Sequence, residues 1–289
     1  MAPYGSPGDG LANIEIDEQI TSLTLKLTTA WQVVRRAAER RSADEGAVPT
    51  GHGSPMHRLA VFDIDGTLTD TNAVDDECFV QSVADVLELQ SHQLDWSDAP
   101  HVTDTALLRW LADRHGRKVD QMTEDAVRDR FLQLLHRAHV ASPWRFGPIR
   151  GAPSVRAELE KRGWQVALAT GAWESSARLK LAAIGFDTAG VPLASSTDAL
   201  TRTEIVRLAH ARSLQAHGSI ERVVSVGDAV WDVRTAIAVG WPFVGVATGA
   251  RADALRAHGA STIVPDLEDV AALCRALAEA EIPTSIEPA

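Results

Sequence analysis

The chain has 289 residues, of which 45% are hydrophobic and 23% are charged, a composition typical of a soluble globular protein. Lys and Arg total 28 against 39 Asp and Glu, which gives a formal net charge of −11. This acidic balance argues against a general nucleic-acid binder, because contacts to a phosphate backbone need a basic surface. It does not exclude a small phosphorylated substrate, since one bound cation and a few local donors reverse the field inside a cleft.

The first 55 residues differ from the rest of the chain, and we interpret them as an N-terminal extension. They begin and end in polar segments with Gly and Pro, as linkers do, and residues 14–41 fit one or two helices. Residues 22–27 also alternate like a strand, so both assignments stay open. The N-terminus lacks the layout of a secretory signal, and the longest uncharged run, residues 235–250, is too short to span a bilayer. We therefore expect a cytoplasmic protein without membrane contact.

The first predicted strand covers residues 59–62, a short apolar run that leads into the segment Asp63-Ile-Asp-Gly-Thr67. Residues 74–142 follow with apolar side chains at helical spacing, which predicts a helical insertion. A stretch with Pro and Gly, residues 142–153, closes this block.

Helices and strands alternate in the rest of the chain. We predict helices at residues 155–162, 175–184, 203–213, 233–239 and 269–280, and strands at 165–169, 222–226, 243–246 and 261–264. Strands joined by helices of this length pair in parallel through right-handed crossovers. The sequence thus predicts an α/β fold: a doubly wound, Rossmann-like parallel sheet from residues 56–73 and 143–289, with a helical domain inserted at 74–142.

Polar side chains follow three of the predicted strands, at the point where each strand ends. Asp63 and Asp65 follow the first, Thr170 follows the strand at 165–169, and Asp228 follows the strand at 222–226. Ligands of open α/β sheets bind at the carboxyl ends of the strands. We therefore expect these side chains to converge in one site.

These segments resemble the motifs of the haloacid-dehalogenase superfamily, specifically its phosphatase branch. The segment Asp63-Ile-Asp-Gly-Thr-Leu-Thr69 resembles the first motif, Ala169-Thr170-Gly171 the second, and Gly227-Asp-Ala-Val-Trp-Asp232 the fourth. The resemblance covers about residues 57–275, with the motifs in the expected order.

The resemblance implies a role for each motif residue. Asp63 would attack phosphorus and become an aspartyl-phosphate, and Asp65 would protonate the leaving group and then deprotonate water. Thr170 and the neighbouring backbone amides would hydrogen-bond the phosphoryl oxygens. Gly66 lets the backbone come close to the phosphoryl group. The candidate substrate-binding residues are Gly66, Thr67, Gly171 and Asn72.

Magnesium is the implied cofactor, because two aspartates repel a phosphate unless a cation with hard oxygen ligands intervenes. By resemblance its ligands are the Asp63 side chain, the Asp65 backbone carbonyl and the Asp228 side chain. Asp232 would lie one helical turn further on, in the outer shell. Capping of a helix is the alternative role for these acids: Asp70 or Asp228 could cap a helix, and the same alternative applies to Asp232.

A Lys or Arg usually precedes the fourth motif in this superfamily and neutralises the transferring phosphoryl group. Arg202 and Lys180 are the two candidates in this chain. We favour Arg202, at the start of a predicted helix, and expect Lys180 to lie on the surface or in packing. Arg and Lys are not equivalent at such sites, which leaves the choice between them open.

The resemblance also makes residues 74–142 a mobile cap that closes over the cleft and supplies specificity groups. The candidate specificity groups are Asn72, Asp75 and Asp76, near the hinge at the start of the insertion, and Arg145 and Arg150, near the point where the chain returns from it.

The function that the sequence predicts is Mg²⁺-dependent hydrolysis of a small phosphorylated metabolite through an aspartyl-phosphate. A phosphomutase acting on a sugar phosphate would use the same two aspartates, so it stays an alternative. A non-catalytic phosphate-binding regulatory module that kept the fold is the other alternative. The sequence does not decide between a monomer and a homodimer.

Overall fold

A six-stranded parallel sheet forms the centre of the computed structural model, which describes residues 57–284. The predicted N-terminal extension, residues 1–55, lies outside the described residues. The strand order is β5-β4-β1-β6-β7-β8 and every neighbouring pair is parallel, which confirms the predicted fold class. The strands are β1 (His57–Phe62), β4 (Trp164–Ala169), β5 (Leu193–Ala194), β6 (Ile220–Gly227), β7 (Phe243–Val246) and β8 (Ile263–Val264).

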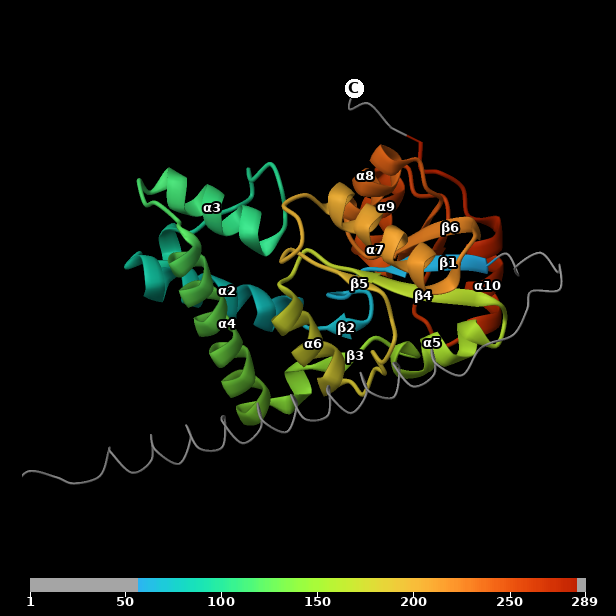
Figure 1. Ribbon diagram of the computed structural model, residues 1–289, viewed down its shortest axis with the longest axis horizontal. Helices are drawn as coiled ribbons and strands as arrows, with labels where there is room; N and C mark the ends of the chain where they lie inside the picture. Colours follow the sequence, from blue (N-terminus) through green and yellow to red (C-terminus); the bar gives the residue numbers. More distant parts are fainter. Residues whose placement is uncertain (1–56, 285–289) are drawn as a thin grey trace, which may run out of the picture. The chain divides into compact units, whose positions relative to one another are not determined.

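Helices cover both faces of this sheet (Figure 1). Ala60 and Phe62 of β1 pack with α5 (Ala152–Glu160), α6 (Glu174–Ala183) and α10 (Val270–Glu279). The alternate side chains, Leu59 and Val61, pack with α7 (Arg202–His217) on the opposite face. Because both faces are buried, β1 reads as a continuous apolar run instead of an alternating one.

The strand order places a topological switch point beside β1. β1 pairs with β4 on one side and with β6 on the other. From β4 the chain continues outward to β5, and it then crosses back to β6 and continues to β7 and β8. Helices α8 (Val230–Val239) and α9 (Gly249–Ala257) pack with β7 in this second half. A crevice is expected outside the carboxyl ends of β1 and β6, where the order reverses.

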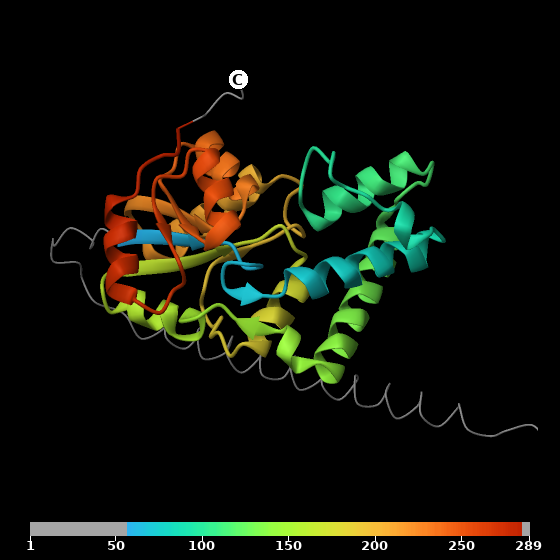
Figure 2. The ribbon, with the colours of Figure 1, turned by 180° about the vertical axis from the view of Figure 1, so that it is seen from behind.

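Three helices occupy the interval of the predicted insertion: α2 (Asn72–Leu87), α3 (Asp104–Arg114) and α4 (Gln121–Ala141). They are framed by two short antiparallel strands, β2 (Thr69–Asp70) and β3 (Gly147–Pro148), so the entry and the exit of the insertion lie side by side. Figures 1 and 2 show α2 and α4 beside α6, with α3 farther from it. Two single turns, Ser91–Gln93 and Pro143–Arg145, complete this region, which we call the helical insertion.

The helical insertion has its own hydrophobic cluster, centred on three aromatic rings. Phe131 of α4 lies with its ring centroid 6.0 Å from that of Phe79 and 5.8 Å from that of Trp173, both edge to face. Trp173 is fully buried and follows β4, so it comes from the part of the chain that forms the six-stranded sheet and its covering helices, which we call the sheet domain. Its side chain nevertheless packs in the hydrophobic cluster of the insertion. This ring therefore fixes the insertion to the loop that ends β4.

The structure contains elements that the sequence pattern did not predict. Helix α9 was missed because it is short and buries few apolar side chains, chiefly Ala252 and Leu255. Strands β2, β3 and β5 have two residues each, too few to show a period. Within residues 57–284, none of the helices combines the length and the apolar character needed to cross a membrane.

We predict that Phe131→Ala destabilises the protein by about 3–5 kcal/mol, because it removes a fully buried ring from the centre of the insertion cluster. The free energy of unfolding from urea titration measures this. Met122→Ala, on the same helix but 81% exposed, is the matched control and should change stability by less than about 0.5 kcal/mol. Equal effects of the two substitutions would contradict the assignment of Phe131 to a packed core.

Candidate active site

A tight turn after β1 carries the first motif. The backbone N–H of Asp63 still donates to Val226 O at 2.9 Å, and the turn then closes through Leu68 N to Ile64 O at 2.8 Å. Gly66 in this turn has φ +82°, and a Cβ there would lie 2.2 Å from Asp228 Oδ2. A residue without a side chain is therefore required for the first motif to approach the fourth.

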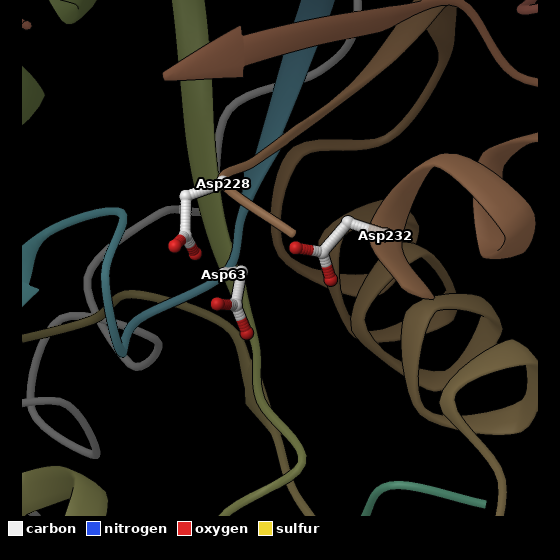
Figure 3. Close-up of side chains that lie close together, drawn as sticks. All are labelled: Asp63, Asp228 and Asp232. Atoms are coloured by element: carbon white, nitrogen blue, oxygen red, sulfur yellow. The ribbon is translucent and has the colours of Figure 1, made fainter. Parts of the chain in front are cut away.

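Three buried carboxylates meet at the carboxyl ends of β1 and β6 (Figure 3). Asp63, Asp228 and Asp232 each offer one oxygen, and these oxygens lie within 4.8 Å of one another. Burial, together with repulsion from Asp232, raises the pKa of Asp63 to about 8. Burial and the charge of Asp63 raise the pKa of Asp228 to about 7, and burial raises that of Asp232 to about 6.

These three acids fit a divalent cation. The raised pKa values show that their negative charges are poorly solvated and repel one another, a repulsion that a bound cation would relieve. Carboxylate oxygens are also the ligands that Mg²⁺ prefers. Asp232 has a second role, since its Oδ2 accepts from Ala229 N at 3.1 Å and so caps α8.

Arg202, the first residue of α7, places its guanidinium against two of the acids. Its Nη1 lies 3.2 Å from Asp63 Oδ1 and 2.9 Å from Asp232 Oδ1. Its Nε donates to Val102 O of the helical insertion at 3.2 Å. A Cβ on Gly171 would lie 2.8 Å from Arg202 Nη2, so the second motif makes room for the guanidinium. Arg202 is thus a cation in direct contact with the predicted nucleophile.

Thr170 ends β4 beside these groups and is 2% exposed. Its Oγ1 accepts from Ala172 N at 3.1 Å, which orients the hydroxyl in the loop after β4. A small pocket is lined by Asp63, Thr170, Arg202 and Asp232 together with apolar side chains of β1 and α7. The structure therefore brings residues of all three motifs to one place.

Thr67 and Arg251 contact Asp228 from two sides. Thr67 Oγ1 donates to Asp228 Oδ1 at 3.2 Å, and Arg251 Nη1 donates to Asp228 Oδ2 at 3.0 Å. Asn72 lies next to Gly66, since its Nδ2 is 2.7 Å from the position that a Cβ on Gly66 would take. Arg251 was not recognised in the sequence, because it lies 23 residues beyond Asp228 in a helix that the pattern did not reveal.

The expectation of a surface position for Lys180 is wrong. Its side chain is fully buried in α6, and its Nζ lies 2.6 Å from Asp65 Oδ2 and 2.5 Å from Asp75 Oδ1. The opposing charges of Asp65 and Asp75 raise the pKa of Lys180 despite its burial, so it is an ammonium ion. A sequence signal existed, because Lys180 lies on the apolar stripe of its helix with Ala177 and Leu181.

Of the other candidates at the ends of the helical insertion, two arginines make ion pairs elsewhere. Arg145 pairs with Glu77 of α2 at 2.8 Å. Arg150 is 70% exposed and pairs with Asp266 and Glu268, which follow β8. Asp76 is exposed, and partial desolvation together with the charge of Asp65 raises its pKa. The structure thus brings Asp75, and not Arg150, into contact with the first motif through Lys180.

Comparisons with known proteins identify relatives of this chain. The model of the haloacid dehalogenase-like hydrolase family matches residues 57–240. A phosphoglycolate phosphatase from Mesorhizobium japonicum is 27% identical over 208 residues, which cover 66% of this chain and 83% of that protein.

Solved structures share the fold at lower identity. A hydrolase from Pseudomonas syringae is similar with a TM-score of 0.57 and 18% identity, covering 75% of this chain and 96% of that one. CbbY from Rhodobacter sphaeroides, as a mutant in complex with xylulose-(1,5)-bisphosphate, has a TM-score of 0.55 and 19% identity, covering 75% and 99%. With the ordered motifs meeting at the switch point, the matched family model shows that this chain belongs to the haloacid dehalogenase-like hydrolases.

Proposed function

We propose that this protein is a Mg²⁺-dependent phosphatase that hydrolyses a small phosphorylated metabolite through an aspartyl-phosphate on Asp63. The observation that carries the proposal is the position of Asp63, buried at the switch point between Arg202 and two further acids. A carboxylate with a cation on one side and a cation site on the other suits attack on a phosphoryl group.

The reaction has two steps. In the first, an oxygen of Asp63 bonds to phosphorus, the ester P–O bond breaks, and Asp65 gives its proton to the leaving oxygen. In the second, Asp65 takes a proton from water, whose oxygen attacks phosphorus and releases inorganic phosphate and the Asp63 carboxylate. Asp65 is 18% exposed at its side chain, so solvent reaches part of it.

Charge stabilisation comes from named groups of the site. Arg202 and the hydroxyl of Thr170 would hold the equatorial oxygens of the phosphoryl group, as their shared pocket with Asp63 supports. Asp63 and Asp228 would hold Mg²⁺ with the Asp65 carbonyl, and Asp232 would lie in the outer shell. When bound, Mg²⁺ neutralises charge on the phosphoryl group and so allows two anions to meet.

We also infer that the helical insertion acts as a cap over the carboxyl ends of β1 and β6. Its segment 102–105 lies directly on the site: Asp104 N donates to Gly171 O at 2.8 Å, and Trp173 N donates to Asp104 Oδ2 at 2.8 Å. Thr103 Oγ1 donates to Leu200 O at 2.7 Å. Because the insertion makes these contacts close to Arg202, little room remains for a substrate beside the site. This supports a small substrate that is enclosed away from water. Phosphoglycolate, the substrate named for the relative from Mesorhizobium japonicum, is the first candidate.

Asp63→Asn should lower the rate of phosphate release by at least about 10³-fold, because it removes the nucleophile while keeping the shape of the side chain. The assay measures inorganic phosphate from 4-nitrophenyl phosphate with and without Mg²⁺. Asp129→Asn, on an exposed position of α4, is the matched control and should keep the wild-type rate. Phosphate release by Asp63→Asn at the wild-type rate would rule out the covalent mechanism.

Mg²⁺ should raise the melting temperature of the wild-type protein, because it relieves the repulsion among the three clustered acids. At about 100 times Kd the stabilisation is about 2.7 kcal/mol, which corresponds to about 5 °C in a chain of this size. Asp228→Asn should abolish most of this shift, as measured by differential scanning calorimetry. An equal shift in both proteins would place the Mg²⁺ site elsewhere.

A panel of phosphorylated metabolites should show release of inorganic phosphate from 2-phosphoglycolate or another small alkyl phosphate. We expect kcat/KM for that substrate to exceed the value for 4-nitrophenyl phosphate, because the cap segment encloses a small substrate. Phosphate that moves between positions of a sugar phosphate without release would instead identify a phosphomutase. Binding of phosphate compounds without turnover would identify a regulatory module.

A further inference from the structure

The fully buried ammonium group of Lys180 connects three separate parts of the protein. Lys180 belongs to α6 of the sheet domain, Asp65 to the loop after β1, and Asp75 to α2, the first helix of the insertion. Its Nζ lies 2.6 Å from Asp65 Oδ2 and 2.5 Å from Asp75 Oδ1. A buried ammonium between two carboxylates holds its partners in one geometry, since losing either contact leaves a desolvated charge unpaired.

The other oxygen of Asp65 is fixed as well. Thr71 Oγ1 donates to Asp65 Oδ1 at 2.6 Å, and Thr69 Oγ1 lies 2.6 Å from Thr71 Oγ1. Each oxygen of Asp65 therefore has one hydrogen-bond partner and keeps a second lone pair, which is enough to carry a proton. The carboxylate is thus held from both sides without being saturated.

The two cations of the site, Arg202 and Lys180, contact different aspartates. Arg202 contacts Asp63 and Asp232, whereas Lys180 contacts Asp65 and Asp75. Lys180 therefore acts on Asp65, the group that exchanges protons with the leaving oxygen, whereas the cation paired with Asp63, the group that attacks phosphorus, is Arg202. Proton transfer requires the donor within hydrogen-bond reach of the leaving oxygen, so a group that fixes Asp65 controls this transfer.

We propose that Lys180 is a positioning residue that holds Asp65 in place for proton transfer and, through Asp75, links that placement to the first helix of the insertion. The inference rests on the proposed phosphatase function and adds a residue and a coupling to it. Lys180 stays an ammonium throughout and exchanges no proton with the substrate. The placement of Asp65 then depends on the position of α2, because Asp75 of α2 pairs with Lys180.

This role predicts a dependence on the leaving group. An alkyl phosphate has a poor leaving group that needs the proton of Asp65, whereas 4-nitrophenolate leaves without one. Loss of Lys180 should therefore slow the first turnover of the alkyl phosphate and spare that of the aryl phosphate. Loosened packing around Lys180 would slow both substrates alike, so the ratio of the two rates separates positioning from a structural role.

The experiment measures first-turnover rates by rapid quench in the full-length protein with Mg²⁺. The substrates are 4-nitrophenyl phosphate and 2-phosphoglycolate, or the alkyl phosphate of the panel that the wild type hydrolyses fastest. For Lys180→Met we expect a loss of about 10²-fold on the alkyl phosphate and less than about threefold on the aryl phosphate. Lys180→Arg should recover part of the alkyl rate. Lys161→Met, at an exposed lysine of the same domain, should match the wild type on both.

A double variant keeps the test valid if Lys180→Met alone is unstable. Lys180→Met with Asp75→Asn removes the ammonium and one of its two buried partners, so it should regain thermal stability. We expect its alkyl rate to remain about 10²-fold low, because Asp65 still lacks its partner.

Two results overturn the inference. Recovery of the alkyl rate in the double variant would mean that Lys180 only neutralises Asp75. Equal losses on the two substrates would mean that Lys180 supports packing. In both cases the proposed function still holds, because the wild type releases phosphate. If the wild type releases phosphate from neither substrate, the proposed function and this inference are overturned together.

Discussion

The structure depends on how the protein tolerates several carboxylates buried at one edge of its sheet. Asp63, Asp228 and Asp232 are each nearly inaccessible to solvent and close enough to share a cation. Such a group of anions is unfavourable without compensation, because burial removes the water that would stabilise each charge. Compensation comes from Arg202 on α7, from Arg251 on α9 and, in the function we propose, from Mg²⁺. The side chains of the site thus leave part of the negative charge of the three acids unbalanced. A bound cation would balance that charge and would also attract a phosphoryl group.

The architecture explains why these charges lie together. β1, β4 and β6 are adjacent and parallel, so the segments that follow them leave the sheet at the same edge. Glycine at position 66 then allows the turn after β1 to come against Asp228. The helix that follows β6 starts within the site, and its capping residue, Asp232, is also one of the clustered acids. One residue thereby serves both local helix stability and the site.

The helical insertion is attached to the site by polar contacts and by aromatic packing. Trp173 follows directly after the second motif and packs between the insertion helices. Val102 O accepts a hydrogen bond from Arg202, and Asp75 pairs with Lys180. Arg202 and Lys180 are thus each held by the insertion as well as by the sheet domain. In a phosphatase this arrangement would make the charge distribution around the substrate depend on the seating of the cap.

The sequence by itself determined the fold class and most of the motif positions. Apolar runs that end in Asp63, Thr170 and Asp228 identify strands whose carboxyl ends carry chemistry, because local periodicity and strand ends are properties of the chain alone. Only the tertiary structure showed that Lys180 contacts Asp65 and Asp75, since sequence spacing does not show which charges face each other across 115 residues. It likewise revealed Arg251 beside Asp228 and turned Arg150 away from the site. Long-range ion pairs depend on how helices pack, whereas the strand-end motifs depend on the order of the elements.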